Sequence, residues 1–267
     1  MVHQHGAKRR DEKNRVKYPE TKMEVHHHSH TERKKWTHYF WEFFMLFLAV
    51  TLGFLVENQR EHITDHKKEI QYIQSYIVDL HEDIKQLDSL VDYCQKRNGM
   101  MDSLSYLLDT PDPDLYGRDI YYYARMLTLV APFFNTDRTI QQLKNGGNLR
   151  LIKKQLVSDA MMDYDRQVRF LENIHDREEE YIREYIKWME ENCDGRVFNK
   201  MIVKGFGFTR PEGNPPLLKK DKPTIIKFIT KIHFLRSANT YMSVNYGKLK
   251  QTALKTLSII KEKYNLE

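Results

Sequence analysis

The sequence predicts an all-α protein, in which one N-terminal transmembrane helix continues into an extracytoplasmic antiparallel helical bundle. Three observations lead to this prediction. Residues 36–57 form an almost unbroken apolar and aromatic run. Apolar residues then recur at three- and four-residue steps over most of residues 58–267, which is the period of an α-helix. Proline and glycine gather in a few short stretches between these patterns, where helices are expected to end.

This organisation divides the chain into three regions. Residues 1–35 are a basic His-rich tail, residues 36–57 are the transmembrane helix, and residues 58–267 are a periplasmic helical-bundle domain. The tail carries ten Lys and Arg against five Asp and Glu and has no apolar periodicity, so we expect it to be disordered and cytoplasmic. Met1 and Met23 are both candidate translation starts.

The length and chemistry of residues 36–56 predict a membrane span. At about 1.5 Å per residue, a helix of this length covers roughly the 30 Å hydrocarbon core of a bilayer. Trp36, Tyr39 and Trp41 lie at its N-terminal end, where aromatic residues mark the membrane interface. No small-residue cleavage site follows, so an uncleaved signal anchor is favoured over a signal peptide or a buried helix of a soluble protein.

Lysine and arginine residues near the span predict its orientation. Residues 16–35 hold five of them and residues 57–76 hold three, and the richer side stays in the cytoplasm. We therefore expect a single-pass protein of the inner (cytoplasmic) membrane with a periplasmic C-terminal domain. Residues 36–267 carry 33 Lys and Arg against 32 Asp and Glu, so the expected partner is the lipid bilayer and no nucleic acid.

A heptad pattern follows the span, and no proline or glycine interrupts residues 57–98. The span and this helix are therefore expected to be continuous. Two interpretations of the apolar seam stay open: a coiled-coil contact with a second copy or another envelope protein, and packing against the protein's own later helices. The seam consists of Ile63, Ile70, Ile73, Ile77, Leu80, Ile84, Leu87 and Val91.

The rest of the chain predicts further helices with short connections. Thr110–Pro113 should end the first long helix, and Asp221 should cap the last one, with Pro223 in its first turn. The intervening elements are a tyrosine-rich helix at 115–130, a short helix through Ile140 and Leu143 that ends at Gly146, a long helix at 158–191, and a Gly/Pro-rich connection at 194–222 with a small strand at 202–208.

Two groups of side chains are candidate metal ligands. His26, His27, His28 and His30 form a dense tract in the tail, and neutral imidazole is a good ligand for zinc, nickel or copper. His62, His66 and Glu69 share one helix face at i, i+4 and i+7. The alternatives are adventitious metal binding by the tract and an ordinary solvated face for the second group.

No signature of an enzyme is present in the sequence. It contains no HExxH, no nucleophile elbow, no paired-glycine nucleotide motif and no CxxC. We therefore predict a non-enzymatic protein without cofactors. Cys94 and Cys193 both fall in the domain expected to be periplasmic, where a disulfide between them or two free thiols are the alternatives.

Two segments carry a resemblance to a known family. The tract at 26–30, the basic Arg33-Lys34-Lys35 and the span through Ile63 are one segment, and Asn135–Tyr164, with its Gly-Asn-Leu-Arg-Leu-Ile element, is the other. Together they resemble a family of single-span helical envelope proteins of Bacteroidetes-type bacteria. The resemblance implies an inner-membrane anchor with a helical periplasmic domain, and it supplies no catalytic residues. A looser likeness exists to periplasmic four-helix sensor domains.

The function expected from these features is protein–protein interaction. We expect a scaffold or accessory subunit of an envelope complex, tethered by its span. The alternative is a periplasmic sensor of a small ligand or metal that signals through a partner. A polar and tyrosine-lined cavity within the bundle would favour the sensor, and a defined oligomer held by residues 63–101 would favour the scaffold.

Overall fold

The computed structural model describes residues 36–203, 205 and 207–266, and it confirms the all-α prediction. The chain divides into two compact units, residues 1–58 and 59–267, and each is described by itself. The elements are α1 (Trp36–Leu108), η1 (Pro113–Tyr116), α2 (Gly117–Met126), α3 (Arg138–Asn145), η2 (Asn148–Leu151), α4 (Gln155–Asn192), α5 (Gly195–Met201), β1 (Ile202–Val203), β2 (Gly207–Phe208) and α6 (Lys222–Tyr264).

The first unit contains the apolar beginning of α1. This stretch is long and apolar enough to cross a membrane, by length and composition, and none of it is buried in the protein. Trp36, Tyr39 and Trp41, the predicted interface residues, are all exposed. The tail at 1–35, with its histidine tract and Met23, lies outside the described residues.

The second unit is a bundle of four chain segments. After α1, the chain returns through α2, an extended stretch (residues 129–137) and α3, and then runs forward again as α4 and back as α6. Asp83 bonds Tyr164 and Arg97 bonds Glu178, so α1 and α4 run in the same direction. α6 is antiparallel to α4 and forms the closest helix pair with it.

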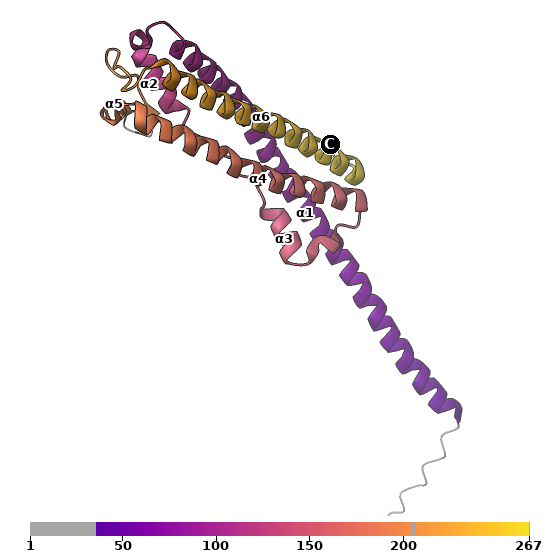
Figure 1. The fold of residues 1–267 in the computed structure, drawn as a ribbon. Helices are drawn as coiled ribbons and strands as arrows, with labels where there is room; N and C mark the ends of the chain where they lie inside the picture. The colour runs from indigo at the N-terminus through magenta and orange to yellow at the C-terminus, as the bar shows by residue number, and fades with distance from the viewer. Residues whose placement is uncertain (1–35, 204, 206, 267) are drawn as a thin grey trace, which may run out of the picture. The chain divides into compact units, whose positions relative to one another are not determined.

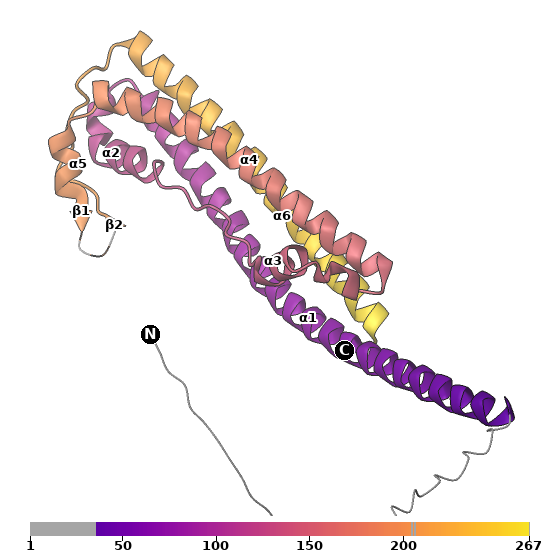
Figure 2. The same ribbon diagram turned by 90° about the horizontal axis from the view of Figure 1, so that it is seen from below.

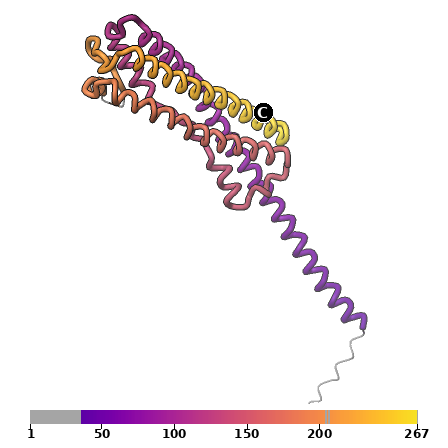
Figure 3. Tube along the Cα trace, in the orientation of Figure 1, coloured from indigo at the N-terminus to yellow at the C-terminus, as the bar shows by residue number. Residues whose placement is uncertain are grey.

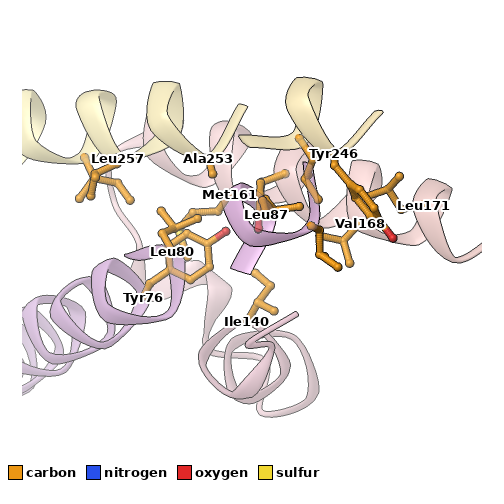
Figure 4. Close-up of a cluster of buried hydrophobic side chains, with 14 of the residues drawn as sticks. Tyr76, Leu80, Leu87, Ile140, Met161, Val168, Leu171, Tyr246, Ala253 and Leu257 are labelled. Atoms are coloured by element: carbon orange, nitrogen blue, oxygen red, sulfur yellow. The ribbon is translucent and has the colours of Figure 1, made fainter. Parts of the chain in front are cut away.

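The core of the bundle has two halves. One half joins residues 73–94 of α1 to α3, the first half of α4 and the second half of α6 (Figure 4). The other joins residues 101–108 of α1 to α2, α5, the end of α4 and the start of α6. Helices that each bury an apolar stripe against their neighbours in this way satisfy the hydrophobic pattern of the sequence.

The ends of the helices follow local chemistry. α1 passes through Gly99 and stops at Leu108, before the prolines that were expected to end it. The Asp221 carboxylate accepts a hydrogen bond from the Thr224 amide at 3.1 Å and so caps α6 as predicted. At the start of α2, a Cβ on Gly117 would lie 2.1 Å from the Pro215 carbonyl oxygen, so only glycine fits there.

The expected strand and its surroundings differ in detail from the prediction. Two short antiparallel strands, Ile202–Val203 and Gly207–Phe208, lie within the expected range, and Ile202 pairs with Phe208. The residues before these strands were expected to be an irregular connection, but residues 195–201 form the helix α5. The Asp194 carboxylate accepts the Arg196 amide at 2.9 Å and caps this short helix.

The buried face of α1 is rotated by one residue from the predicted seam. Ile73, Leu80 and Leu87 are buried as expected, but Ile70, Ile77, Ile84 and Val91 are half-buried and Ile63 is exposed. Their place in the core is taken by the residues one position earlier, which are Glu69, Tyr76, Asp83 and Leu90. The prediction assumed apolar residues at this position, whereas the structure also buries Glu69 and Asp83, whose carboxylates have hydrogen-bond partners in other segments.

Candidate functional sites

A row of polar residues on α1, which we call the polar ladder, forms hydrogen bonds with the segment between α2 and α4. Tyr93, Gln86, Asp79 and Tyr72 stand seven residues apart, so they share one helix face. Tyr93 donates to the Leu129 carbonyl at 2.9 Å, and the Gln86 amide exchanges hydrogen bonds of 2.6 and 3.0 Å with the backbone of Phe134. The ladder thereby gives partners to backbone groups of an extended stretch that lacks a sheet or helix of its own.

Asp79 and Tyr72, the two members of this ladder nearest the N-terminus, bind α3 and the following turn η2. Asp79 is buried and accepts the Arg138 guanidinium at 2.6 Å and the Thr139 amide at 3.2 Å. The Asn148 side-chain amide donates to the Tyr72 hydroxyl at 3.1 Å. The resulting arrangement is structural, since it fixes the path of the chain between α2 and α4.

The candidate metal residues on α1 are not brought together. Glu69 is buried and accepts hydrogen bonds from the Lys153 amide at 2.8 Å and the Tyr264 hydroxyl at 2.5 Å. His66 lies 3.4 Å from its other oxygen, while His62 is exposed. Within residues 36–203, 205 and 207–266, no group of three or more His, Cys, Asp or Glu side chains could hold a metal ion.

A buried ion pair lies in the interior of the bundle. The Arg97 guanidinium binds the Glu178 carboxylate, and their side chains are only 3% and 4% exposed. Arg97 also donates to the Asn239 side chain and the Leu127 carbonyl, both at 3.0 Å. The four groups come from α1, α4, α6 and the C-cap of α2, so the pair connects all four segments of the bundle.

Asp83 is the centre of a second buried polar group. It accepts the Tyr164 hydroxyl and the Thr136 amide, both at 2.7 Å. Burial raises the pKa of Asp83 above its ordinary value, and the two hydrogen bonds partly oppose this effect. Tyr76 lies close by, and burial also raises the pKa of its hydroxyl, which has no hydrogen-bond partner among the described residues.

Both cysteines are free and buried, and they lie in different halves of the core. Cys94 belongs to the half that contains α3, and Cys193 to the half that contains α5. Burial raises the pKa of the Cys94 thiol to about 11 and that of Cys193 to about 12. The structure therefore supports two unreactive thiols, and the disulfide alternative is wrong for this fold.

An aromatic groove runs along the outer side of the α4–α6 pair. The Tyr181 and Phe234 rings stack there with centroids 6.4 Å apart, and both are about half exposed. With Tyr241 and Ala238 they line a cavity of about 330 Å³. We call the part of this cavity formed by Tyr181, Phe234 and Tyr241 the aromatic groove.

A second cavity lies between α4, α6 and the extended stretch. It has a volume of about 370 Å³ and is lined by aromatic rings and by acidic side chains. Its position beside the extended stretch follows from the polar ladder, which fixes Phe134 against α1. We call this the acidic cavity, and its lining residues are Pro132, Phe133, Phe134, Asn135, Asp137, Val168, Leu171, Glu172, His175, Asp176 and Tyr246.

Comparison with known proteins does not assign any of these sites. No protein-family model, curated protein or solved structure matches the chain. Function must therefore be argued from the geometry of the sites themselves.

Sequence reasoning missed the polar ladder, the central ion pair and both cavities. A signal for the first two exists, because Tyr72, Asp79, Gln86 and Tyr93 recur at heptad spacing, and Glu69, Asp83 and Arg97 recur at twice that spacing. The two cavities have no comparable signal. They are formed by residues from helices far apart in the chain, whose register depends on the packed fold.

Proposed function

We propose that this protein is a single-pass inner-membrane protein that acts through protein–protein interaction, as a scaffold or accessory subunit of an envelope complex. Its tail would be cytoplasmic and its helical bundle periplasmic. The aromatic groove is the observation that carries the proposal. Its stacked and exposed rings lie in a hollow between two helices, and aromatic residues of this kind supply much of the binding energy of protein interfaces.

The chemistry of the buried polar groups supports a non-enzymatic role. Glu69, Asp79, Asp83 and Glu178 each bind a backbone amide, a tyrosine hydroxyl or an arginine within the fold. Carboxylates engaged in this way stabilise the structure and are poorly placed to exchange protons with a substrate. The resemblance of residues 26–63 and 135–164 to single-span envelope proteins is consistent with the same proposal.

The apolar seam on α1 is less accessible to a binding partner than the aromatic groove is. Ile73, Leu80 and Leu87 already pack in the protein's own core, so a coiled-coil homodimer through them would require the bundle to open. The groove needs no rearrangement. A partner's amphipathic helix laid between α4 and α6 would cover the exposed rings, as in other helix-in-groove complexes.

Site-specific photocrosslinking in living cells tests this proposal. A photoreactive residue at position 181 or 234 should yield a discrete adduct, whose partner mass spectrometry identifies. The same residue at position 106, where an exposed tyrosine lies on α1, is the matched control and should yield none. Recovery of only the monomer from both groove positions would contradict the proposal.

A sensor of small ligands is the second candidate function, and the acidic cavity favours it. The cavity is polar, contains a tyrosine and has a volume typical of small-molecule sites. Ligand binding beside the extended stretch would signal through that stretch and the helices that enclose it. If adding a ligand changes the crosslinking pattern of the aromatic groove, then ligand binding and partner binding are coupled.

A further inference from the structure

Three segments of the bundle meet at the Glu69 carboxylate. Glu69 is buried and accepts hydrogen bonds from the Lys153 amide at 2.8 Å and the Tyr264 hydroxyl at 2.5 Å. The Lys154 ammonium lies over the Tyr264 ring, 5.2 Å from its centroid. Figure 2 shows the C-terminal end of α6 beside α1. These contacts bring the residues around positions 69, 153 and 264 together at one end of the bundle.

The two ends of the bundle differ in charge. The residues within four positions of these contacts hold seven Lys and Arg against four Asp and Glu, in the ranges 65–73, 149–157 and 260–267. The other end is joined by the Lys220–Asp114 ion pair and by a hydrogen bond from the Leu218 amide to the Asn192 carbonyl. Matching stretches there hold five Lys and Arg against six Asp and Glu, in the ranges 110–118, 188–196 and 216–224. The excess of positive charge therefore lies at the end around Glu69.

Most basic side chains at this end have no acidic partner. Within the described part of the chain, Lys263 binds Glu262, and the other six have no ion pair. Five of the six are exposed and the last is half-buried. We call these six the basic surface: Lys67, Lys68, Arg150, Lys153, Lys154 and Lys261. Since Glu69 is held by hydrogen bonds inside the protein, Asp65 is the one described carboxylate nearby that is neither buried nor paired.

Two further features suit this surface to a layer of lipid headgroups. Leu156, two positions after Lys154, is 61% exposed, and an apolar side chain among cations can enter the boundary between headgroups and acyl chains. α4 begins at Gln155 and no side chain caps it, so its first backbone amides add partial positive charge. A soluble anion would gain nothing from the exposed leucine, whereas a membrane surface would.

The proposed span would tether the basic surface to lipid. Lys67 follows Val56, the last residue of the apolar run, by 11 residues. A chain of this length covers at most about 40 Å even when it is fully extended. Tethering raises the effective concentration of lipid at the surface, so contacts that are individually weak become sufficient.

We propose that the basic surface binds the anionic phospholipid headgroups of the membrane that holds the span. Clustered lysine and arginine side chains close to a span are a recurrent means of binding anionic lipid. The attraction is electrostatic, so added salt should weaken it. This inference rests on the proposed membrane insertion and goes beyond it, because it assigns a lipid partner to the bundle itself.

Fluorescence quenching in liposomes tests the proposal. The full-length protein carries a fluorophore on Gln155→Cys, an exposed position beside the basic surface, and the liposomes contain a small fixed share of lipid with a spin-labelled headgroup. Neutral phosphatidylcholine is compared with a mixture that contains phosphatidylglycerol in both leaflets, so the orientation of the span does not affect the result. We expect about twofold stronger quenching in the anionic liposomes at low salt, and no difference at about 0.5 M NaCl.

Two double variants separate this surface from general charge attraction. Lys153→Gln/Lys154→Gln should lose the difference in quenching between the two kinds of liposome. Lys219→Gln/Lys222→Gln, which removes the same charge from exposed positions at the other end of the bundle, should keep it. Circular dichroism verifies that both variants retain the fold.

The outcomes also separate this inference from the proposed function. Equal quenching of the wild type in neutral and anionic liposomes, or equal loss in both double variants, would overturn the lipid contact alone. Release of the protein from the liposomes by extraction at high pH would overturn the lipid contact together with the proposed membrane insertion.

Discussion

The Arg97–Glu178 pair shows how a single residue joins distant segments. Arg97 reaches α4, α6 and the C-cap of α2 from one position on α1. Charges this deeply buried are costly unless each is paired and hydrogen-bonded. The pair therefore specifies which helix faces meet in the middle of the bundle, more than it adds stability.

The first prediction concerns the loss of one member of this pair. Arg97→Met should lower the free energy of unfolding by about 3–5 kcal/mol, because it leaves Glu178 charged and buried. The double variant Arg97→Met/Glu178→Leu should recover most of that loss. Urea unfolding of the detergent-solubilised protein, followed by circular dichroism, measures both. Arg183→Met, in an exposed pair with Glu179, is the control and should cost less than about 1 kcal/mol.

The second prediction concerns Asp83. Its pKa is raised by burial above the ordinary value of 3.8, so the folded state holds the proton more tightly than the unfolded chain does. Ionisation of Asp83 therefore costs stability as the pH rises above 3.8 towards the raised pKa. Asp83→Asn cannot ionise, so the melting temperature of the wild type should fall relative to that of the variant over this range. A difference that does not vary with pH would contradict this assignment.

At the scale of the element, α1 is organised by heptads that carry more than apolar residues. One face packs on α4 and α6, and a neighbouring face, the ladder of Tyr72, Asp79, Gln86 and Tyr93, binds the returning segment. The heptad period of this helix was visible in the sequence. Its phase was not, because apolar content alone favours Ile84 over Asp83, and the burial of Asp83 depends on its hydrogen-bond partners in other segments.

The third prediction tests the phase of α1. Leu87 is fully buried, whereas Val78 is 49% exposed. Leu87→Ala should therefore lower the free energy of unfolding by about 2–5 kcal/mol, and Val78→Ala should change it by less than about 1 kcal/mol. Chemical denaturation of the two variants under the same conditions gives the comparison. Equal losses would mean that the buried face is broader than the structure shows.

The other helices were easier to predict than α1. α4 and α6 lie within a few residues of the ranges expected, since their caps and apolar stripes are local features of the sequence. The tyrosine-rich helix is shorter than expected and ends at Met126. Its continuation is extended, because Pro132 disfavours helix there and the polar ladder of α1 supplies the hydrogen bonds that a helix would have made.

At the scale of the molecule, the span and the bundle carry different parts of the function. The span has the length and apolarity to hold the protein in a membrane, and the bundle carries two surfaces with distinct chemistry. The proposed protein partner would bind the aromatic groove, and the acidic cavity is the site of the alternative small-ligand function. Neither could be predicted from the sequence, because each depends on the register of helices that are joined only in the folded bundle.

The proposed topology can be tested directly with an engineered thiol. The native thiols of Cys94 and Cys193 are buried, so they are poor reporters. Lys96 is exposed on α1, and Lys96→Cys gives the bundle a reactive site without disturbing the core. Thr31→Cys in the tail is the matched control for the opposite side of the membrane.

Labelling with a membrane-impermeant maleimide, in cells whose outer membrane has been opened, tests the central claim that the bundle is a periplasmic domain held by one span. If the bundle is periplasmic, Lys96→Cys reacts while the inner membrane is intact, and Thr31→Cys reacts only after it is broken. Labelling of Lys96→Cys only after the inner membrane is broken would mean that the bundle lies on the cytoplasmic side.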